Sequence, residues 1–191
     1  MPSLHPTEHR GLRELFAFSR SLATHYDQLA DHLPAAQTGA FRDGAESARE
    51  LLRQLETHAA AYGLHGKPAA QGLGSSIGTV RAEVRNRFLE TDRAARFALS
   101  EIAYLVGLLA YLRRVAETRG DARARDFCAG WQHRMEEVER EARAAAAELG
   151  GDPDTAMKPY DTSLVGRALQ SVGFVLGSVG EWTDRQAAKG G

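Results

Sequence analysis

Apolar residues recur at steps of three and four along four separate stretches of this chain, which is the period of helices with one buried face. β-Branched residues are sparse, and Ala, Leu, Arg and Glu dominate, as is typical of helices. The predicted helices begin at or near Thr7, Thr38, Arg93 and Asp121. The pattern therefore predicts an all-α fold.

Local signals mark the ends of these helices. Thr7 and Thr38 are the expected N-caps of the first two helices, and Asp121 is the expected N-cap of the fourth. Pro34 ends the first helix, and Gly63 occupies the position after the second helix where left-handed backbone is favourable. Because only a short loop joins them, the first two helices should be antiparallel neighbours.

A longer connection follows the second helix. Residues 64–76 contain glycines and a proline without a helical pattern, so we expect a crossover at the end of the bundle. A short amphipathic helix is predicted over 77–89, with a bend near Thr91 and Asp92 before the third long helix. Residues 163–182 carry a further apolar stripe, which predicts a C-terminal fifth helix.

This order of elements predicts the fold and the domains. Four long helices with two short loops and one long central crossover have the connectivity of a ferritin-like four-helix bundle. With 191 residues the chain has room for one ordinary core. Residues 1–151 are expected to form the bundle, and 152–191 a linker with the C-terminal amphipathic helix, which is part of the same domain or an assembly element.

Composition narrows the classes of partner and the compartment. The chain has 24 basic and 25 acidic residues, so its net charge of -1 gives no field that would hold nucleic acid. Cys128 is the single cysteine, and residues 1–10 lack the apolar segment of a signal peptide. These features favour a cytoplasmic protein. Cys128 lies on the apolar stripe of its helix, which predicts a buried thiol without a redox role.

Several stretches carry a resemblance to a known family. They are LRELFAFSRSL at 12–22, LETHAAAYGLHGKP at 55–68, EIAYLVGLLAYLRRVA at 101–116 and RMEEVEREA at 134–142. Over roughly residues 4–150 the chain resembles the ferritin-like bundles typified by the bacterial stress-induced proteins YciE and YciF. The resemblance implies a helical bundle with a stress-associated role and, in many ferritin-like proteins, a pair of iron or manganese ions.

The metal ligands of that family are largely missing here. Such sites use inward carboxylates and Glu-x-x-His pairs, and this sequence contains no Glu-x-x-His. Ser19 stands where the first helix of the family has its glutamate, and of the acidic pattern in the third helix only Glu101 remains. Ala48, Met135 and Val138 occupy other inward positions. We therefore expect no catalytic residues, no cofactor and no ferroxidase-like activity.

Five residues are the remaining metal-ligand candidates. Glu101 is interpreted as a carboxylate on the flank of its helix, paired with an arginine, rather than as a relic ligand. His58 is one step off the inner stripe of its helix and is interpreted as a histidine at the bundle edge. His133, Glu136 and Glu137 have the spacing of a surface metal site, but they should face solvent. A non-standard iron or manganese site built from these residues is the alternative hypothesis.

The strongest signal for function is surplus apolar surface. The stretch 97–112 contains one charge and is apolar on every side, and the C-terminal stripe adds a second apolar face. Because charged residues interrupt or bound both stretches, neither is suited to span a bilayer, and membrane contact is not expected. The favoured hypothesis is a non-catalytic protein that self-assembles or binds a protein partner. Its predicted interface residues are Leu105, Leu108, Leu109, Leu112, Leu169, Val172, Leu176 and Val179.

Overall fold

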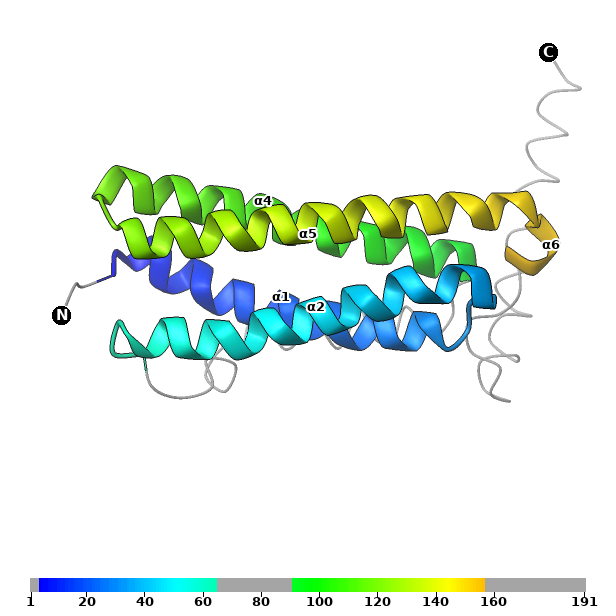
Figure 1. The fold of residues 1–191 in the computed structure, drawn as a ribbon, viewed down its shortest axis with the longest axis horizontal. Coiled ribbons are helices and arrows are strands. Elements are labelled where there is room, and N and C mark those ends of the chain that lie inside the picture. Colours follow the sequence, from blue (N-terminus) through cyan, green and yellow to red (C-terminus); the bar gives the residue numbers. More distant parts are fainter. Residues whose placement is uncertain (1–3, 65–90, 157–191) are drawn as a thin grey trace, which may run out of the picture.

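The computed structural model describes residues 4–64 and 91–156, and the elements within them are helical (Figure 1). The long helices are α1 (Pro6–Ala30), α2 (Ala35–Ala60), α4 (Thr91–Arg119) and α5 (Ala122–Glu148). A 3₁₀ turn η2 (Leu149–Gly151) and the single turn α6 (Pro153–Ala156) follow α5. The predicted all-α bundle is confirmed. The helices predicted over 77–89 and 163–182 lie outside the described residues.

The N-cap of helix α1 lies two residues before the one predicted from the sequence. His5, not Thr7, is the N-cap, and its Nδ1 accepts the Thr7 backbone N–H at 3.2 Å. The Glu8 carboxylate accepts the His5 backbone N–H at 2.8 Å, which completes a capping box. Pro6 takes the first helical position, where its missing N–H is harmless. The expected Thr7 cap is therefore wrong.

Helix α2 also starts before its predicted cap. Pro34 precedes the first helical residue, Ala35, and makes no side-chain capping bond. Thr38 lies inside the first turn, where the carbonyls of Ala30, Leu33 and Pro34 all lie within hydrogen-bond distance of its hydroxyl, which can donate to one of them at a time. Thr38 therefore ties α2 back to the end of α1 instead of capping α2.

The ends predicted from glycine and aspartate are confirmed. Gly63 after α2 and Gly120 after α4 have φ values of +76° and +70°, a conformation in which a side chain would be strained. The Asp121 side chain accepts the Ala124 backbone N–H at 3.0 Å and caps α5. Since Gly120 and Asp121 reverse the chain tightly, α4 and α5 form an antiparallel hairpin.

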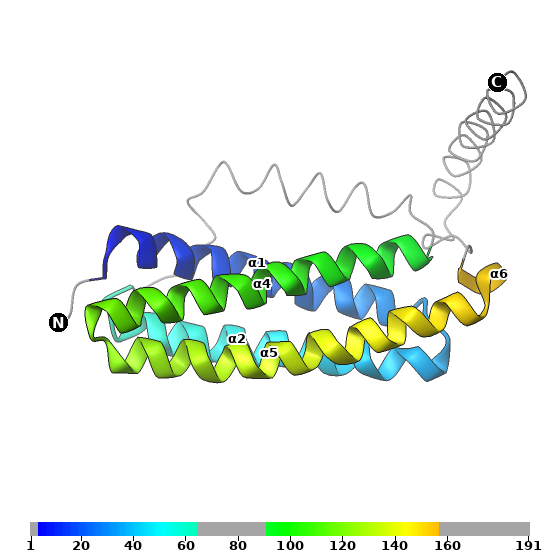
Figure 2. The ribbon, with the colours of Figure 1, turned by 90° about the horizontal axis from the view of Figure 1, so that it is seen from above.

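The four helices form two antiparallel hairpins that pack side by side (Figures 1 and 2). α1 contacts α2 and α4, and α5 contacts α2 and α4, so each long helix has two neighbours. Contacts between Glu8 and Arg119 and between His25 and Glu101 show that α1 and α4 are antiparallel. The diagonal helices α2 and α4 are consequently parallel, and Leu64 and Thr91 lie at opposite ends of the bundle (Figure 1).

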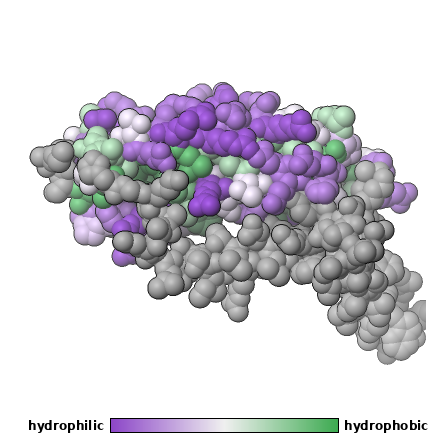
Figure 3. All heavy atoms as spheres, turned by 90° about the horizontal axis from the view of Figure 1, so that it is seen from below, coloured by the Kyte–Doolittle hydropathy of each residue, from purple (hydrophilic) through white to green (hydrophobic). Residues whose placement is uncertain are grey.

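The core lies along the axis between the four helices. Tyr26 and Phe41 meet edge to face, with ring centroids 5.1 Å apart, between α1 and α2. On α5, the predicted inward residues Cys128, Met135 and Val138 are all buried. Hydrophilic side chains cover much of the described surface on the α1–α2 side (Figure 3). The large side chains with almost no exposure are Tyr26, Phe41, Leu15, Leu22, Leu29, Leu51, Leu55, Ile102, Leu105, Leu109 and Met135.

Helix α4 has the composition of a core helix. Among the described residues it is the one helix long and apolar enough to cross a membrane. Burial within the bundle accounts for this composition, because Leu105, Leu109 and Leu112 all pack into the core. α4 packs against both α1 and α5 and is thus covered on more than one side, while Tyr104 and Tyr111 on its remaining face are exposed.

Candidate functional site

The interior of the bundle does not fit a di-metal centre. Such a centre needs several carboxylates and histidines that converge from four helices. Among residues 4–64 and 91–156, no three His, Cys, Asp or Glu side chains are grouped so that they could hold a metal ion. Ser19, Ala48, Met135 and Val138 instead fill the inward positions, and all four are buried. The donor set on these helices is therefore too small for a pair of metal ions.

Glu101 forms a buried carboxylate cluster that links α1 to α4. Its Oε2 lies 2.6 Å from Nδ1 of His25, and its Oε1 accepts the Ser21 hydroxyl at 3.1 Å. Glu101 and His25 are each only 8% exposed, so their contact is shielded from solvent. The expected arginine partner on the flank of α4 is wrong. A histidine and a serine from α1 satisfy this carboxylate instead.

The order of these three side chains argues against nucleophilic catalysis. In a serine-type triad the histidine lies between the nucleophile and the acid, so that it takes the hydroxyl proton. Here the carboxylate of Glu101 lies between Ser21 and His25. The Ser21 hydroxyl donates to one oxygen of the Glu101 carboxylate, and His25 contacts the other oxygen, so the histidine is not placed between the hydroxyl and the acid. The cluster is therefore arranged to hold α1 against α4.

His58 lies inside the bundle rather than at its edge, which corrects the sequence-based interpretation. Its ring is 5% exposed and stacks on Phe127 of α5, with centroids 4.1 Å apart and an interplanar angle of 14°. Burial, together with the charge of Arg123, lowers the pKa of His58 from 6.5 to about 4. At neutral pH this histidine is an uncharged aromatic packing residue.

Tyr62 and Asp121 form a polar contact close to this stack. The Tyr62 hydroxyl donates to Oδ2 of Asp121 at 2.8 Å, and burial with this bond raises the pKa of Tyr62 to about 12. Burial alone would raise the pKa of Asp121, but hydrogen bonds from Ala124 and Tyr62 lower it. The contact closes the end of the bundle where α2 meets the start of α5.

The predicted surface trio faces solvent as expected. The side chain of His133 is 78% exposed, and its Nε2 lies 3.6 Å from Oε1 of Glu137. Glu136 accepts a hydrogen bond from Gln132 on the same helix. His58, Glu101 and this trio do not form one group of donors. The five metal-ligand candidates therefore lie in three separate places.

Cys128 is buried, as predicted from its helical position. It is 2% exposed, and burial, with a smaller contribution from Asp121, raises the pKa of its thiol to about 12. A thiol in this environment is protonated and poorly nucleophilic at neutral pH.

The leucines predicted as an interface are used inside the chain. Leu105, Leu108, Leu109 and Leu112 are between 0 and 9% exposed and belong to the core cluster. They are buried because α4 turns these positions toward α1 and α5. They are thus not available for a second chain, which corrects half of the predicted interface. The other half, Leu169, Val172, Leu176 and Val179, lies outside the described residues.

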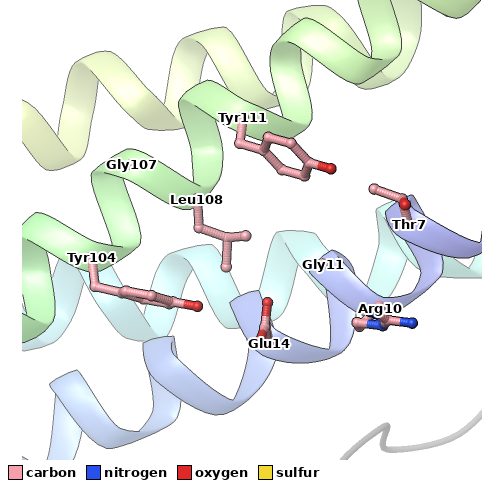
Figure 4. A pocket seen from close by; sticks show the side chains of 8 residues that line it. All are labelled: Thr7, Arg10, Gly11, Glu14, Tyr104, Gly107, Leu108 and Tyr111. Atoms are coloured by element: carbon pink, nitrogen blue, oxygen red, sulfur yellow. The ribbon is translucent and has the colours of Figure 1, made fainter.

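A groove between α1 and α4 was not predicted from the sequence (Figure 4). Its volume is about 410 Å³. Tyr104 and Tyr111, which are 45% and 50% exposed, are the only exposed large apolar side chains in the described part of the chain. Phe18 packs on Tyr104 with ring centroids 4.3 Å apart. The lining residues are Thr7, Arg10, Gly11, Glu14, Tyr104, Gly107, Leu108 and Tyr111.

The groove combines apolar and polar side chains. Burial and the neighbouring Glu14 carboxylate, which accepts a hydrogen bond from the tyrosine, raise the pKa of Tyr104. Figure 4 shows the Tyr104 hydroxyl and the Glu14 carboxylate turned toward the same space, with Leu108 between the two tyrosines. Gly107 leaves open space above the backbone of α4. The arrangement suits an apolar side chain inserted between two aromatic rings.

Comparison with known protein families, with curated proteins and with solved structures finds no match for this chain.

Proposed function

We propose that this chain is a ferritin-like helical-bundle protein without a di-metal centre, possessing no enzymatic activity, that acts by assembling with itself or with a protein partner. The observation that carries this proposal is the filled interior of the bundle. Apolar side chains and Ser19 occupy the positions where metal donors would have to converge, and Glu101 is bound by His25 and Ser21. A stress-associated, cytoplasmic role belongs to the proposal on the strength of the family resemblance alone.

The surface for assembly is the C-terminal apolar stripe at Leu169, Val172, Leu176 and Val179. The described helices bury their own apolar stripes against one another, so this further stripe is surplus to the four-helix core. A segment with several glycines is a poor helix former alone, since each interior glycine costs ~1 kcal/mol relative to alanine. The segment therefore needs an apolar partner surface to become stable.

Light scattering on the full-length chain tests the assembly. We expect a mass above that of the 20.8 kDa monomer or capture of a specific partner. Serine substitutions at Leu169, Val172 and Leu176 should abolish either result, whereas the matched polar-face variant Arg167→Ser/Gln170→Ser should not. A full-length chain that is monomeric at tens of micromolar and captures no partner would refute the proposal.

Metal binding at a non-standard site is the second candidate function. One observation favours it: α1 and α4 bring a histidine and a carboxylate, His25 and Glu101, within 2.6 Å of each other. Elemental analysis after purification without chelator decides between the candidates. Iron or manganese near one equivalent per chain, lost in Glu101→Ala and retained in the surface control Glu136→Ala, would replace the first proposal.

A further inference from the structure

The α1–α4 side of the bundle is a candidate docking surface within the chain. It carries the groove of about 410 Å³ and the aromatic side chains Phe18, Tyr104 and Tyr111. Both tyrosines are roughly half exposed, and Gly107 between them leaves room for an inserted side chain. An exposed aromatic pair beside a groove is the kind of surface that an amphipathic helix covers.

The ends of the described segments restrict what lies on this side. Leu64 follows α2 at one end of the bundle, and Thr91 begins α4 at the other (Figure 1). Because α2 and α4 are diagonal neighbours, the chain between them has to pass either the α1 side or the α5 side of the bundle. Any connection from Leu64 to Thr91 therefore has two routes open to it.

The two routes differ in chemistry. Along the outward face of α5, His133, Glu136, Arg140 and Glu141 are exposed, so the middle of this route is charged. The α1–α4 route carries the aromatic side chains and the groove. Residues 77–89 repeat Ile77, Val80, Val84 and Phe88 at helical spacing, and such a stripe is stabilised only against an apolar surface. The match of apolar stripe to aromatic surface favours the α1–α4 route.

The length of the segment fits this route. The 29 residues of α4 extend over ~43 Å at a helical rise of 1.5 Å per residue. A helix over 77–89 would cover ~20 Å of this length, and the preceding residues in extended form would cover the rest. Since residue 89 is almost adjacent to Thr91, the helix would run antiparallel to α4 and place Ile77 and Val80 near Tyr104.

We propose that the α1–α4 surface at Phe18 and Tyr104, beside the groove, is the docking site for residues 77–89 of the same chain. The covalent connection at Thr91 holds the segment at high effective concentration, which a second copy or a separate protein would have to exceed. The proposal is independent of the assembly proposed above, because assembly uses the C-terminal stripe.

Cross-linking in the full-length chain tests this docking. In a Cys128→Ser background, Arg81→Cys is combined with Ser100→Cys on α4 or, as the matched control, with Glu141→Cys on α5; both partner positions are exposed. A short bismaleimide should join Arg81→Cys to Ser100→Cys within one chain, at least tenfold faster than to Glu141→Cys. Circular dichroism checks that each variant keeps the helical content of the parent.

The other outcomes overturn the proposal. Preferred cross-linking to Glu141→Cys would place the segment on the α5 route. Equal or absent cross-linking in both pairs would mean that the segment does not bind at one defined position on the bundle. A dimer cross-linked through Ser100→Cys would assign the surface to a second copy. Cross-linking of Ser100→Cys to Leu176→Cys would assign it to the C-terminal stripe. Monomer or oligomer mass by light scattering reports the proposed assembly separately.

Discussion

Gly44 of α2 lies at a close contact between helices, and replacing it with alanine is a direct test of the packing. A Cβ atom built at Gly44 would lie 2.6 Å from two ring carbons of Tyr26 and 2.9 Å from Cγ1 of Val138. Tyr26 has no exposed surface and is held edge to face by Phe41, so its ring has little room to move. The added methyl group must therefore push α2 away from α1 and α5.

The size of the effect follows from two opposing contributions. Alanine in place of a helical glycine stabilises a helix by ~0.5–1 kcal/mol, because the unfolded chain loses freedom. Overpacking a tight core destabilises by ~1–3 kcal/mol. We expect Gly44→Ala to lower the free energy of unfolding by about 1–2 kcal/mol and the Tm by roughly 2–8 °C for a chain of this size.

Gly39→Ala is the matched control, because Gly39 is in the same helix and a Cβ there would meet nothing within 4 Å. It should leave stability unchanged or raise it by up to ~1 kcal/mol, since only the propensity gain applies. Urea unfolding followed by circular dichroism measures both variants, and their difference removes the shared propensity contribution. If Gly44→Ala is as stable as Gly39→Ala, the tight packing of α1, α2 and α5 described here is incorrect.

Three further predictions concern the polar groups. The pKa of His58 falls from 6.5 to about 4 on folding, so the unfolded state binds the extra proton between these values and stability should drop as the pH falls through this range. The full shift corresponds to at most ~3.4 kcal/mol of stability lost as the pH falls; His58→Gln should flatten this part of the pH profile, and an unchanged slope would contradict the assignment. For the buried pair, a double-mutant cycle of His25→Ala and Glu101→Ala should give a coupling energy of about 1–3 kcal/mol, whereas additive losses would mean that the contact contributes nothing. The Cys128 thiol should react with Ellman's reagent at a rate set by unfolding, and rapid labelling in native buffer would disprove its burial.

Helical periodicity was sufficient to predict which face of α5 is buried. Cys128, Met135 and Val138 were expected to face inward, and all three are buried. The reason is physical: α5 is long and strongly charged elsewhere, so only one stripe can pack against neighbours. The turn at Gly120 and Asp121 could also be predicted from the sequence, because a left-handed glycine and an aspartate N-cap are local signals.

His58 was misplaced because periodicity does not give the width of a buried face. It was judged one step outside the stripe marked by Leu55 and Ala59, as though α2 packed against a single helix. α2 contacts both α1 and α5, so its buried face is wide enough to include His58 and Ser47. The number of neighbours of a helix is a property of the tertiary fold, and it was not available from the apolar pattern.

The contacts of Glu101 could not be predicted from the apolar pattern of its own helix. Its partner His25 shares the buried face of α1 with Leu22 and Leu29, a spacing that the sequence does contain. What the sequence does not contain is the alignment of α1 with α4, which sets the level at which their residues meet. Without this alignment, the sequence gives no reason to pair a buried histidine on one helix with a buried acid on another. An arginine on the surface is the more common partner for a carboxylate.

Polar contacts at both ends of the α1–α4 contact fix that alignment. Near one end Glu101 binds His25 and Ser21, and near the other the buried carboxylate of Glu8 pairs with Arg119. Sliding α4 by one turn would bring an apolar residue opposite His25 and leave the Glu101 carboxylate among apolar side chains, at a desolvation penalty of several kcal/mol. Apolar stripes alone tolerate such a slide better, because a leucine one turn away along the helix takes the place of the leucine that has moved. The polar pairs therefore select one register of α4 against α1, and with it the position of Tyr104 relative to Phe18 and to the groove between the two helices.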